Sequence, residues 1–399
     1  MKKYMIINMH WNNRGDEAAN RALIDSLLEK DDTCKINVQI CMNNCDASFI
    51  ENERVHVLKS RFPESSDLFE YIMMYLSKGK IAWSQNGKEF VNSIKLADLI
   101  LHAPGGPSIG DIYYYAERPY LLRLLLAKRL KKNYSFYAPS MGPFSSWKRN
   151  IIRKYILKNA KHIIFRENIS GDFFNKFLPQ KKYYVTLDSA FQNEINIQEN
   201  EKLMMKDQKL VNFFNNYKKI VGITITDLQW NPKYKGNTNI VNRIEKSFTG
   251  LISYLNQNNC GVIFIPQLFG NRNDSIYMEK FKQSNCFVLS DKYDSFFQQF
   301  LISKLFVVVG MRYHSNIFSA KMMTPFISIS YEQKMKGFID KINYSDYCIL
   351  VENLSEKDLV NRFEIINNNY VNVKEQLSKV NNELKKISRQ TTCIVLDEE

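Results

Sequence analysis

The stretch "VVVGMRYHSNIFSAK" ends an apolar run with Arg312 and His314, in a chain that has only five histidines. If the run is a buried strand, the two side chains lie on the same side of its extended continuation. Lys334 follows the next apolar run, "PFISIS", at the start of another expected helix. Arginine offers a bidentate fork to an oxyanion, lysine adds a point charge and histidine titrates near neutral pH. A lone histidine at such a place is more often structural, but the three together favour a pocket for a dianion.

Two clusters in the first half occupy similar positions at the ends of apolar runs. The turn "HWNNRGDEAANRAL" places Asp16 where a helix should begin, and helix capping or a direct substrate role would both explain it. "PGGPSIGD" contains Gly105 and Gly106, where the backbone can approach a phosphate or carboxylate closely. The segment lacks the patterns of a P-loop and of a dinucleotide-binding turn. It is therefore a weak anion-binding signal when taken alone.

Two charged residues close the first half of the chain in the same manner. Arg166 ends the run "HIIF" and suits an anion clamp, although an ion pair with Glu167 would explain it equally well. Asp188 ends "YYVTLD", where capping of the next turn is favoured over catalysis. In the second half, "IFIPQLFGNRND" places three more polar residues after a strand: Gln267, Asn271 and Asp274.

The elements that must position these residues alternate between short apolar runs and amphipathic stretches, which predicts an α/β fold with parallel sheets. We expect two doubly wound, Rossmann-like domains facing a cleft, with ligands at the carboxyl ends of the strands. The polar, strandless segment "FQNEINIQENEKLMMKDQKL" separates them, giving domains 1–195 and 215–399. Ser315 and Asn316 should cap the helix after the opening stretch. From about residue 355 the pattern predicts one long polar helix.

Length and composition agree with this division. A chain of 399 residues with 45% hydrophobic residues is a globular protein of about two domains. No apolar run is long enough for a transmembrane helix, and the short N-terminal run reads as a first strand rather than a signal peptide, so we expect a cytoplasmic protein. Cys34, Cys41 and Cys45 lack the paired spacing of a zinc site, and we expect no metal.

The positive charge is concentrated in one segment. The chain carries a formal net charge of +14, and no acidic residue occurs between Arg118 and Lys161. Two amphipathic helices with solvated basic faces would account for this. The alternative is a surface for an acidic substrate or an anionic membrane, to which Lys128, Arg129, Lys131 and Lys132 would contribute. No nucleic-acid-binding pattern is present.

Taken in order, these motifs resemble the polysaccharide pyruvyl transferase family. The matching segments are "NRGDEAA", "HAPGGPSIGD", "FRENIS", "LDSAF", "IFIPQ" and "MRYHSNIFSAKMMTPFISISYEQKMKGF", and together they extend from Tyr4 to Asp340. The last is the most specific, since the family shows R-x-H, a helix, a small residue before proline, and then Y-x-x-K. Arg14 and Glu17 occupy positions at which relatives vary, so the resemblance does not rest on them.

The resemblance implies the twin-Rossmann fold of glycosyltransferases and the transfer of pyruvate from phosphoenolpyruvate to a saccharide as a ketal, in cell-envelope or exopolysaccharide synthesis. It assigns substrate binding or catalysis to Arg166, Arg312, His314 and Lys334, and places Asp16, Gly105 and Gly106 near the cleft. We expect His314 as acid or base, with Asp16 or Asp188 as candidates for the base. No cofactor is expected, because arginine and lysine can supply positive charge. The acceptor would be a saccharide, in some pathways lipid-linked, and a nucleotide-sugar glycosyltransferase or a non-enzymatic glycan-binding protein remains the alternative.

Overall fold

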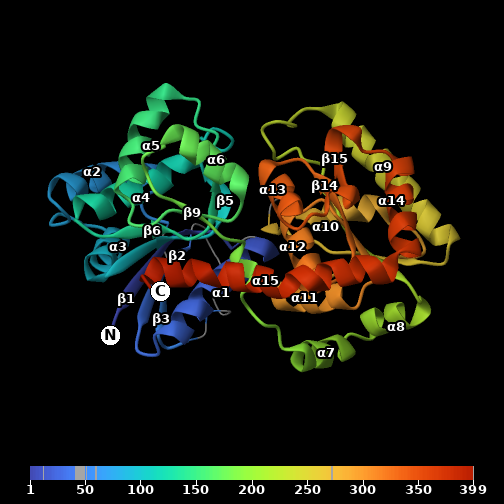
Figure 1. Cartoon of the computed structure of the whole chain (residues 1–399). Helices are drawn as coiled ribbons and strands as arrows, with labels where there is room; N and C mark the ends of the chain where they lie inside the picture. Colours follow the sequence, from blue (N-terminus) through green and yellow to red (C-terminus); the bar gives the residue numbers. More distant parts are fainter. Residues whose placement is uncertain (12, 41–49, 51, 59–60, 271–272, 399) are drawn as a thin grey trace. The chain divides into compact units, whose positions relative to one another are not determined.

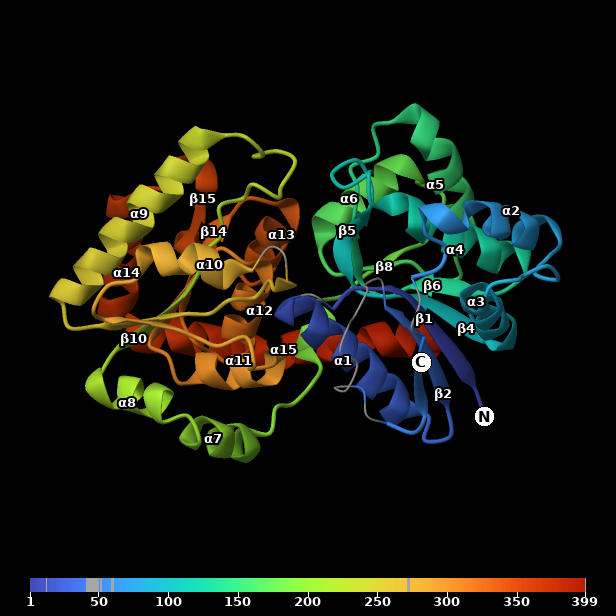
Figure 2. The same cartoon turned by 180° about the vertical axis from the view of Figure 1, so that it is seen from behind.

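The computed structural model describes the chain except for residues 12, 41–49, 51, 59–60, 271–272 and 399. Its internal contacts divide the chain into two units, which Figures 1 and 2 show with their elements labelled. The first unit comprises residues 1–12, 16–193 and 386–399, and the second comprises 13–15 and 194–385. The second unit differs from the predicted second domain, 215–399, at both of its ends. Residues 194–214 join the second unit, and the C-terminal residues 386–399 return to the first.

A five-stranded parallel sheet forms the centre of the first unit, in the order β3-β2-β1-β4-β6. Its strands are β1 (Lys3–Met9), β2 (Lys35–Ile40), β3 (Val55–Leu58), β4 (Leu99–His102) and β6 (Tyr134–Phe136). Two short parallel pairs accompany it: β5 (Gly105–Ile109) with β7 (Pro139–Met141), and β8 (Ile164–Phe165) with β9 (Tyr184–Val185). The helices are α1 (Arg14–Lys30), α2 (Leu68–Leu76), α3 (Gln85–Leu96), α4 (Glu117–Arg129), α5 (Trp147–Asn159) and α6 (Asn168–Phe177).

The central strands β1 and β4 are buried on both faces, which explains why they are apolar at most positions. In β1, Met5 and Ile7 enter one hydrophobic cluster, together with Leu121 and Leu124 of α4. Their neighbours Tyr4 and Ile6 enter the opposite cluster, which also contains residues of α1 and Val395 near the C-terminus. Strand residues alternate between faces, so a fully buried strand must be apolar on both sides. The doubly wound arrangement follows from this pattern.

The second unit contains a six-stranded parallel sheet in the order β12-β11-β10-β13-β14-β15. Its strands are β10 (Ile220–Thr224), β11 (Gly261–Phe264), β12 (Cys286–Val288), β13 (Val307–Gly310), β14 (Phe326–Ser330) and β15 (Cys348–Leu350). Its helices are α7 (Ile197–Met205), α8 (Gln208–Asn216), α9 (Thr238–Gln257), α10 (Asp274–Met278), α11 (Ser295–Ser303), α12 (Tyr313–Lys321), α13 (Gln333–Lys341) and α14 (Glu356–Asn368). The last helix, α15 (Tyr370–Leu396), begins in the second unit and ends in the first.

Two local expectations are wrong, whereas the connection between the predicted domains is strandless as expected in its described residues and contains helices α7 and α8. The expected loop at "PGGPSIGD" contains strand β5. The single long helix from residue 355 is two helices, because Asn369 interrupts it between α14 and α15. Among the described residues, no helix is long and apolar enough to cross a membrane.

Candidate functional site

Each large sheet has one point at which the chain reverses the direction of strand addition. In the first unit this point lies between β1 and β4, and in the second between β10 and β13. The loops after two such adjacent strands diverge to opposite sides of the sheet, which leaves a crevice at their carboxyl ends where ligands of this fold class bind. Asp16 and the glycine pair follow β1 and β4, while Arg312 and His314 follow β13.

Arg312 is the N-cap residue of α12 and is held by a carboxylate. Its Nε lies 3.1 Å from Oδ2 of Asp274, and its Nη2 contacts Oδ1 of the same residue. Asp274 also accepts hydrogen bonds from the backbone N–H groups of Gln267 and Leu268, at 3.1 and 3.0 Å. Burial disfavours the charged guanidinium, but the carboxylate of Asp274 outweighs it and raises the pKa of Arg312. The arginine is therefore a permanently charged, fixed group.

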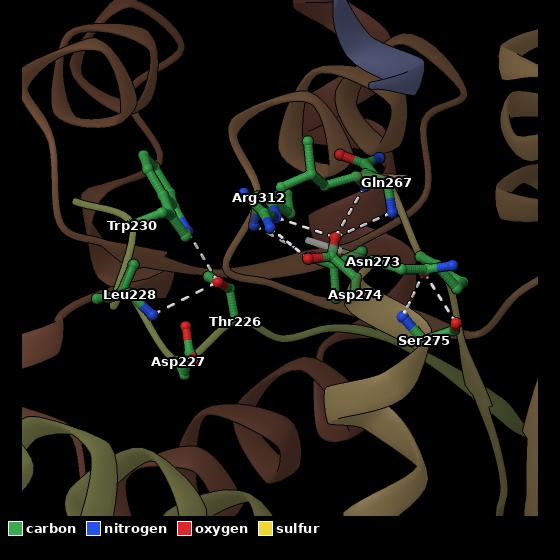
Figure 3. Close-up of polar contacts among 12 residues, drawn as sticks. Thr226, Asp227, Leu228, Trp230, Gln267, Asn273, Asp274, Ser275 and Arg312 are labelled. Atoms are coloured by element: carbon green, nitrogen blue, oxygen red, sulfur yellow. Dashed lines mark hydrogen bonds and ion pairs between the residues drawn. The ribbon is translucent and has the colours of Figure 1, made fainter. Parts of the chain in front are cut away.

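A cavity of about 400 Å³ opens beside this ion pair. Figure 3 shows Arg312 and Asp274 on one side of it and Thr226, Asp227 and Trp230, from the loop after β10, on the other. The Arg312 guanidinium lies 5.3 Å from the centre of the Trp230 ring, whose Nε1 donates to Thr226 Oγ1 at 3.0 Å. The remaining lining residues are Gln229, Asn273, Ile276, Tyr277 and Lys280. Cations, carboxylates and an aromatic ring thus surround a space large enough for a small ligand.

His314 lies in the first turn of α12, not on an extended continuation of β13. The helix begins at Tyr313, so Ser315 and Asn316 are helical residues and do not cap it, contrary to expectation. The His314 side chain is 8% exposed and packs edge-to-face with Tyr313, at 4.9 Å between ring centres. On its other side lies Gly15, because a Cβ atom at Gly15 would fall 1.8 Å from His314 Nδ1. Glycine at this position is what allows the imidazole to occupy its place.

Residues 13–15 of the motif "NRGDEAA" belong to the second unit, where they lie beside His314. The Arg14 N–H donates to the Gln267 carbonyl at 2.9 Å, and Asn13 forms an isolated β-bridge with Leu268. The Arg14 guanidinium lies 4.5 Å from the ring centre of Phe269. Residues 13–15 and the "MRYHSN" motif therefore lie together within the second unit.

Lys334 occupies the first turn of α13, as predicted. Its Nζ lies 2.8 Å from Glu332 Oε2, and Glu332 Oε1 accepts from Asn231 Nδ2 at 2.8 Å. The ammonium group is also 5.9 Å from the ring centre of Tyr313. Lys334 is thus near the start of α12, in the helix that follows β14, the neighbour of the strand that precedes Arg312.

Arg166 is fully enclosed in the first unit. Its Nη1 lies 2.8 Å from Asp188 Oδ2, its Nε donates to Ser140 Oγ at 2.9 Å, and its Nη2 donates to the Gly106 carbonyl at 3.1 Å. The alternative of a surface ion pair with Glu167 is wrong, because that carboxylate accepts instead from Ser170 N–H. Asp188 caps the following turn by accepting from Ala190 N–H, as the favoured interpretation held. Arg166 therefore supports the glycine loop directly.

The two loop glycines have φ angles that other residues avoid, +125° at Gly105 and +96° at Gly106. A Cβ at Gly106 would lie 2.2 Å from Ser108 N and 2.9 Å from the Ser140 carbonyl. A Cβ at Gly105 would lie 3.3 Å from Asp16 Oδ1. Asp16, in the first turn of α1, therefore lies beside the glycine loop, as the predicted site requires.

Sequence reasoning missed two histidines at the switch point of the first sheet. His10 follows β1 and His102 ends β4, and both rings pack edge-to-face on Tyr120 at 5.6 and 6.0 Å. His10 Nε2 is hydrogen-bonded to the Tyr120 hydroxyl. The strand-end rule that selected Arg312 applies equally to "INMH" and "LILH", so the signal was present. Burial lowers the pKa of His10, and Asp16 partly opposes the effect.

His102 is almost completely buried and its Nδ1 lies 2.8 Å from the Ala103 carbonyl. Burial is the main reason why its pKa falls to about 4, and His10 and Arg123 lower it further. It is neutral at physiological pH. Tyr120, His10 and Asp16 thus form a polar group beside the glycine loop that could exchange a proton with a hydroxyl group.

In the part of the chain that the structure describes, no group of three or more His, Cys, Asp and Glu side chains is arranged to hold a metal ion. Asn271, Cys41 and Cys45 lie outside the described residues.

Comparison with known proteins agrees with the motif order. The family described as polysaccharide pyruvyl transferase matches residues 13–333. The amylovoran biosynthesis protein AmsJ of Erwinia amylovora is 23% identical over 425 residues, covering 99% of both chains. The solved structures that resemble this chain share its fold at low identity. UDP-GlcNAc 2-epimerase of Neisseria meningitidis, bound to UDP-GlcNAc, has a TM-score of 0.63 at 12% identity and 99% coverage of both chains.

Anabaena HepE in complex with UDP and glucose has a TM-score of 0.60 at 11% identity, covering 100% of this chain and 99% of that one. The fold is thus the predicted twin-Rossmann arrangement of glycosyltransferases and epimerases. The family match covers most of the chain and includes Asp16, the glycine pair, Arg166, Asp188, Arg312 and His314, and it ends one residue before Lys334. The chain belongs to the polysaccharide pyruvyl transferase family, and it is accordingly a transferase.

Proposed function

We propose that this protein transfers pyruvate from phosphoenolpyruvate to two hydroxyl groups of a saccharide, forming a ketal. The observation that carries the proposal is the convergence of Arg312, His314 and Lys334 on neighbouring strand ends of the second sheet, within a chain of this family. Phosphoenolpyruvate carries a phosphate and a carboxylate on a small frame. Several fixed cations are therefore needed to hold it.

The reaction balances with the groups at hand. Protonation of the methylene carbon of phosphoenolpyruvate makes a methyl group and an oxocarbenium-like centre at the adjacent carbon. One sugar hydroxyl attacks that carbon, the bond to the phosphate oxygen breaks, and a second hydroxyl closes the ketal ring. Of the two hydroxyl protons, one balances the new methyl group and the other leaves with phosphate. No oxidant or reductant is required.

We assign the proton donation at carbon to His314, which the glycine at position 15 and the Tyr313 ring hold in place. A positioned acid or base contributes roughly 10²–10⁴ in rate. Arg312 and Lys334 hold the anionic groups of the donor. Each already has a carboxylate partner, Asp274 or Glu332, which fixes its geometry before the donor arrives.

We assign the binding of the saccharide acceptor to the first unit. Asp16 is the proposed base for the attacking hydroxyl, and it lies beside Gly105 and raises the pKa of His10 against the effect of burial. Arg166 and Asp188 act by holding the glycine loop, since Arg166 donates to the Gly106 carbonyl and is paired with Asp188. A direct contact between Arg166 and the donor stays a prediction.

The test is acceptor-dependent release of phosphate. Purified protein would be incubated with phosphoenolpyruvate and a panel of cell-envelope saccharides, free and lipid-linked, and phosphate would be followed by ³¹P NMR. The proposal expects release only when a suitable acceptor is present. No release with any member of the panel would count against it.

A second candidate is a nucleotide-sugar-dependent glycosyltransferase, favoured by similarity to structures solved with UDP, UDP-GlcNAc or glucose. Thermal denaturation separates the two. Phosphoenolpyruvate should raise the melting temperature in the first case, and UDP- or GDP-sugars should raise it in the second.

A further inference from the structure

Helix α5 exposes a stripe of large apolar side chains along its length. Trp147, Ile151 and Tyr155 are 72%, 67% and 48% exposed. They are spaced four residues apart, so they lie on one face of the helix. Exposed apolar residues that occur singly need no explanation, but three in a row on one helix mark an interaction surface.

Lysines border this stripe, and the helix itself carries no acidic residue. Lys148, Lys154 and Lys158 are exposed on the same helix, and α5 contains five basic residues and no acidic one. The nearest acidic residues in sequence are Glu117 and Glu167. An apolar stripe bordered by lysines, with tryptophan and tyrosine among its members, is the pattern of a helix that lies in the interface of an anionic membrane.

The opposite face of α5 anchors it to the first unit. Ile156 and Leu157 belong to the core, and Tyr134 donates to the Ile156 carbonyl at 2.7 Å. Arg153 is fully buried between the helix and two carboxylates, at 2.7 Å from Asp111 and 2.8 Å from Glu117. The helix is therefore rigidly formed before it meets any partner, and it lies at the outer side of its unit in both views (Figures 1 and 2).

The aromatic surface extends beyond the helix. Tyr114 and Tyr115 are 47% and 61% exposed, and the Arg149 guanidinium lies 3.7 Å from the centre of the Tyr114 ring. Tyrosine rings with a hydroxyl at one end suit the headgroup region of a bilayer.

We infer that the stripe Trp147–Ile151–Tyr155, with its bordering lysines, docks the protein on a bilayer containing anionic lipids. Helix α2 supplies the contrast that selects this surface. It also exposes apolar residues, Phe69 at 69% and Leu76 at 63%, but residues 64–83 contain three acidic and two basic residues. Of these two helices, α5 alone combines an apolar stripe with the charge that an anionic surface attracts.

The sequence indicated Lys128, Arg129, Lys131 and Lys132 as the membrane-binding residues, but two of these four have structural roles instead. Arg129 donates to the Tyr75 carbonyl at 3.1 Å and Lys132 to the Ala97 carbonyl at 2.8 Å. These two cations hold internal segments together. The membrane contact is therefore assigned to α5 and not to the end of α4, and it does not depend on which donor the enzyme uses.

Flotation with vesicles tests the inference on the full chain. Vesicles of phosphatidylcholine with 30% phosphatidylserine should carry the wild type to the top of the gradient at low salt, and pure phosphatidylcholine should not. The charge variant Lys148→Glu/Lys154→Glu/Lys158→Glu and the apolar variant Trp147→Ser/Ile151→Ser/Tyr155→Ser should both lose binding. Replacing any one of these three lysines with a neutral residue should weaken binding by about five-fold.

Two matched variants serve as controls, Phe69→Ser/Leu76→Ser on α2 and Lys128→Glu/Lys131→Glu at the end of α4. Both should float like the wild type. Failure of the wild type to float, floating of both α5 variants, or loss of floating in the α2 control would overturn the inference. So would self-association in the absence of lipid that the apolar variant abolishes.

Tryptophan fluorescence provides a measurement that does not rely on the triple variants folding. The chain has four tryptophans, and Trp147 is the one on the proposed surface. Anionic vesicles should shift the emission to the blue, and Trp147→Phe should remove that shift. A shift that persists in Trp147→Phe would place the lipid contact elsewhere.

Discussion

Each cation that the strand-end pattern selected lies beside a carboxylate: Arg312 with Asp274, Lys334 with Glu332, and Arg166 with Asp188. Lys334 and Glu332 are close in sequence, but Asp274 is 38 residues before Arg312 and Asp188 is 22 residues after Arg166. A sequence shows where an arginine occurs and not which carboxylate the fold brings to it. The placement of these residues at strand ends could therefore be predicted, but their ion pairs could not.

The buried pair in the first unit permits a double-mutant cycle. Arg166→Met leaves Asp188 as an uncompensated buried charge and should reduce the free energy of unfolding by about 3–5 kcal/mol. Adding Asp188→Asn removes that charge, so the double variant should lose less than the sum of the single changes, by about 1–3 kcal/mol. Urea unfolding measures all four proteins. Strictly additive losses would show that the two residues do not act as a pair.

His102 should make stability depend on pH. Its pKa is about 4 in the folded protein and ordinarily 6.5, so protonation favours the unfolded chain. The stability that the neutral ring contributes is fully present above pH 6.5 and falls as the pH drops toward 4. Between pH 7.5 and 5 the loss should be about 2 kcal/mol.

The variant His102→Gln cannot titrate and should lose less stability than the wild type over this range, in urea unfolding at both pH values. His56→Gln is the matched control, because His56 is on the surface, where Glu89 lies 2.9 Å from its Nε2. Identical pH dependence in wild type and His102→Gln would contradict the assignment.

At the scale of elements, most helix and strand positions could be predicted, since buried parallel strands are continuous apolar runs and the helices between them are amphipathic. The failures have particular causes. Strand β5 contains two glycines and a proline, which are rare in strands, and only its pairing with β7 makes it one. Helix α12 begins two residues earlier than the apparent cap at Ser315, because the Arg312 backbone takes the N-cap conformation without a side-chain hydrogen bond.

Gly106 tests whether the loop of β5 has the strained backbone described above. Alanine there meets both an unfavourable φ and a backbone clash with Ser108, so Gly106→Ala should cost about 2–4 kcal/mol of unfolding free energy. Gly236 has a φ of +78° but no atom within 4 Å of the position of a Cβ. Gly236→Ala should therefore cost only about 1–2 kcal/mol. Equal losses of unfolding free energy in the two variants would show that the clash with Ser108 does not contribute.

At the scale of the whole molecule, the two-domain organisation and the family could be recognised from motif order, whereas the exchange of segments between units could not. Residues 13–15 belong by contact to the second unit and residues 386–399 to the first. Both are short pieces whose own residues give no sign of it. The first exchange places Gly15 against His314 within the second unit.

The most direct test of the central claim is the fate of the pyruvate carbon. Phosphoenolpyruvate labelled with ¹³C at the phosphate-bearing carbon would be incubated with the acceptor that supports phosphate release, and the product followed by ¹³C NMR. The wild type and the surface control His56→Ala should convert the label to a ketal carbon at equal rates. His314→Ala should lower the rate by about 10²–10⁴ without lowering the melting temperature by more than a few degrees. An unchanged rate in His314→Ala, or label recovered only as free pyruvate, would contradict the account.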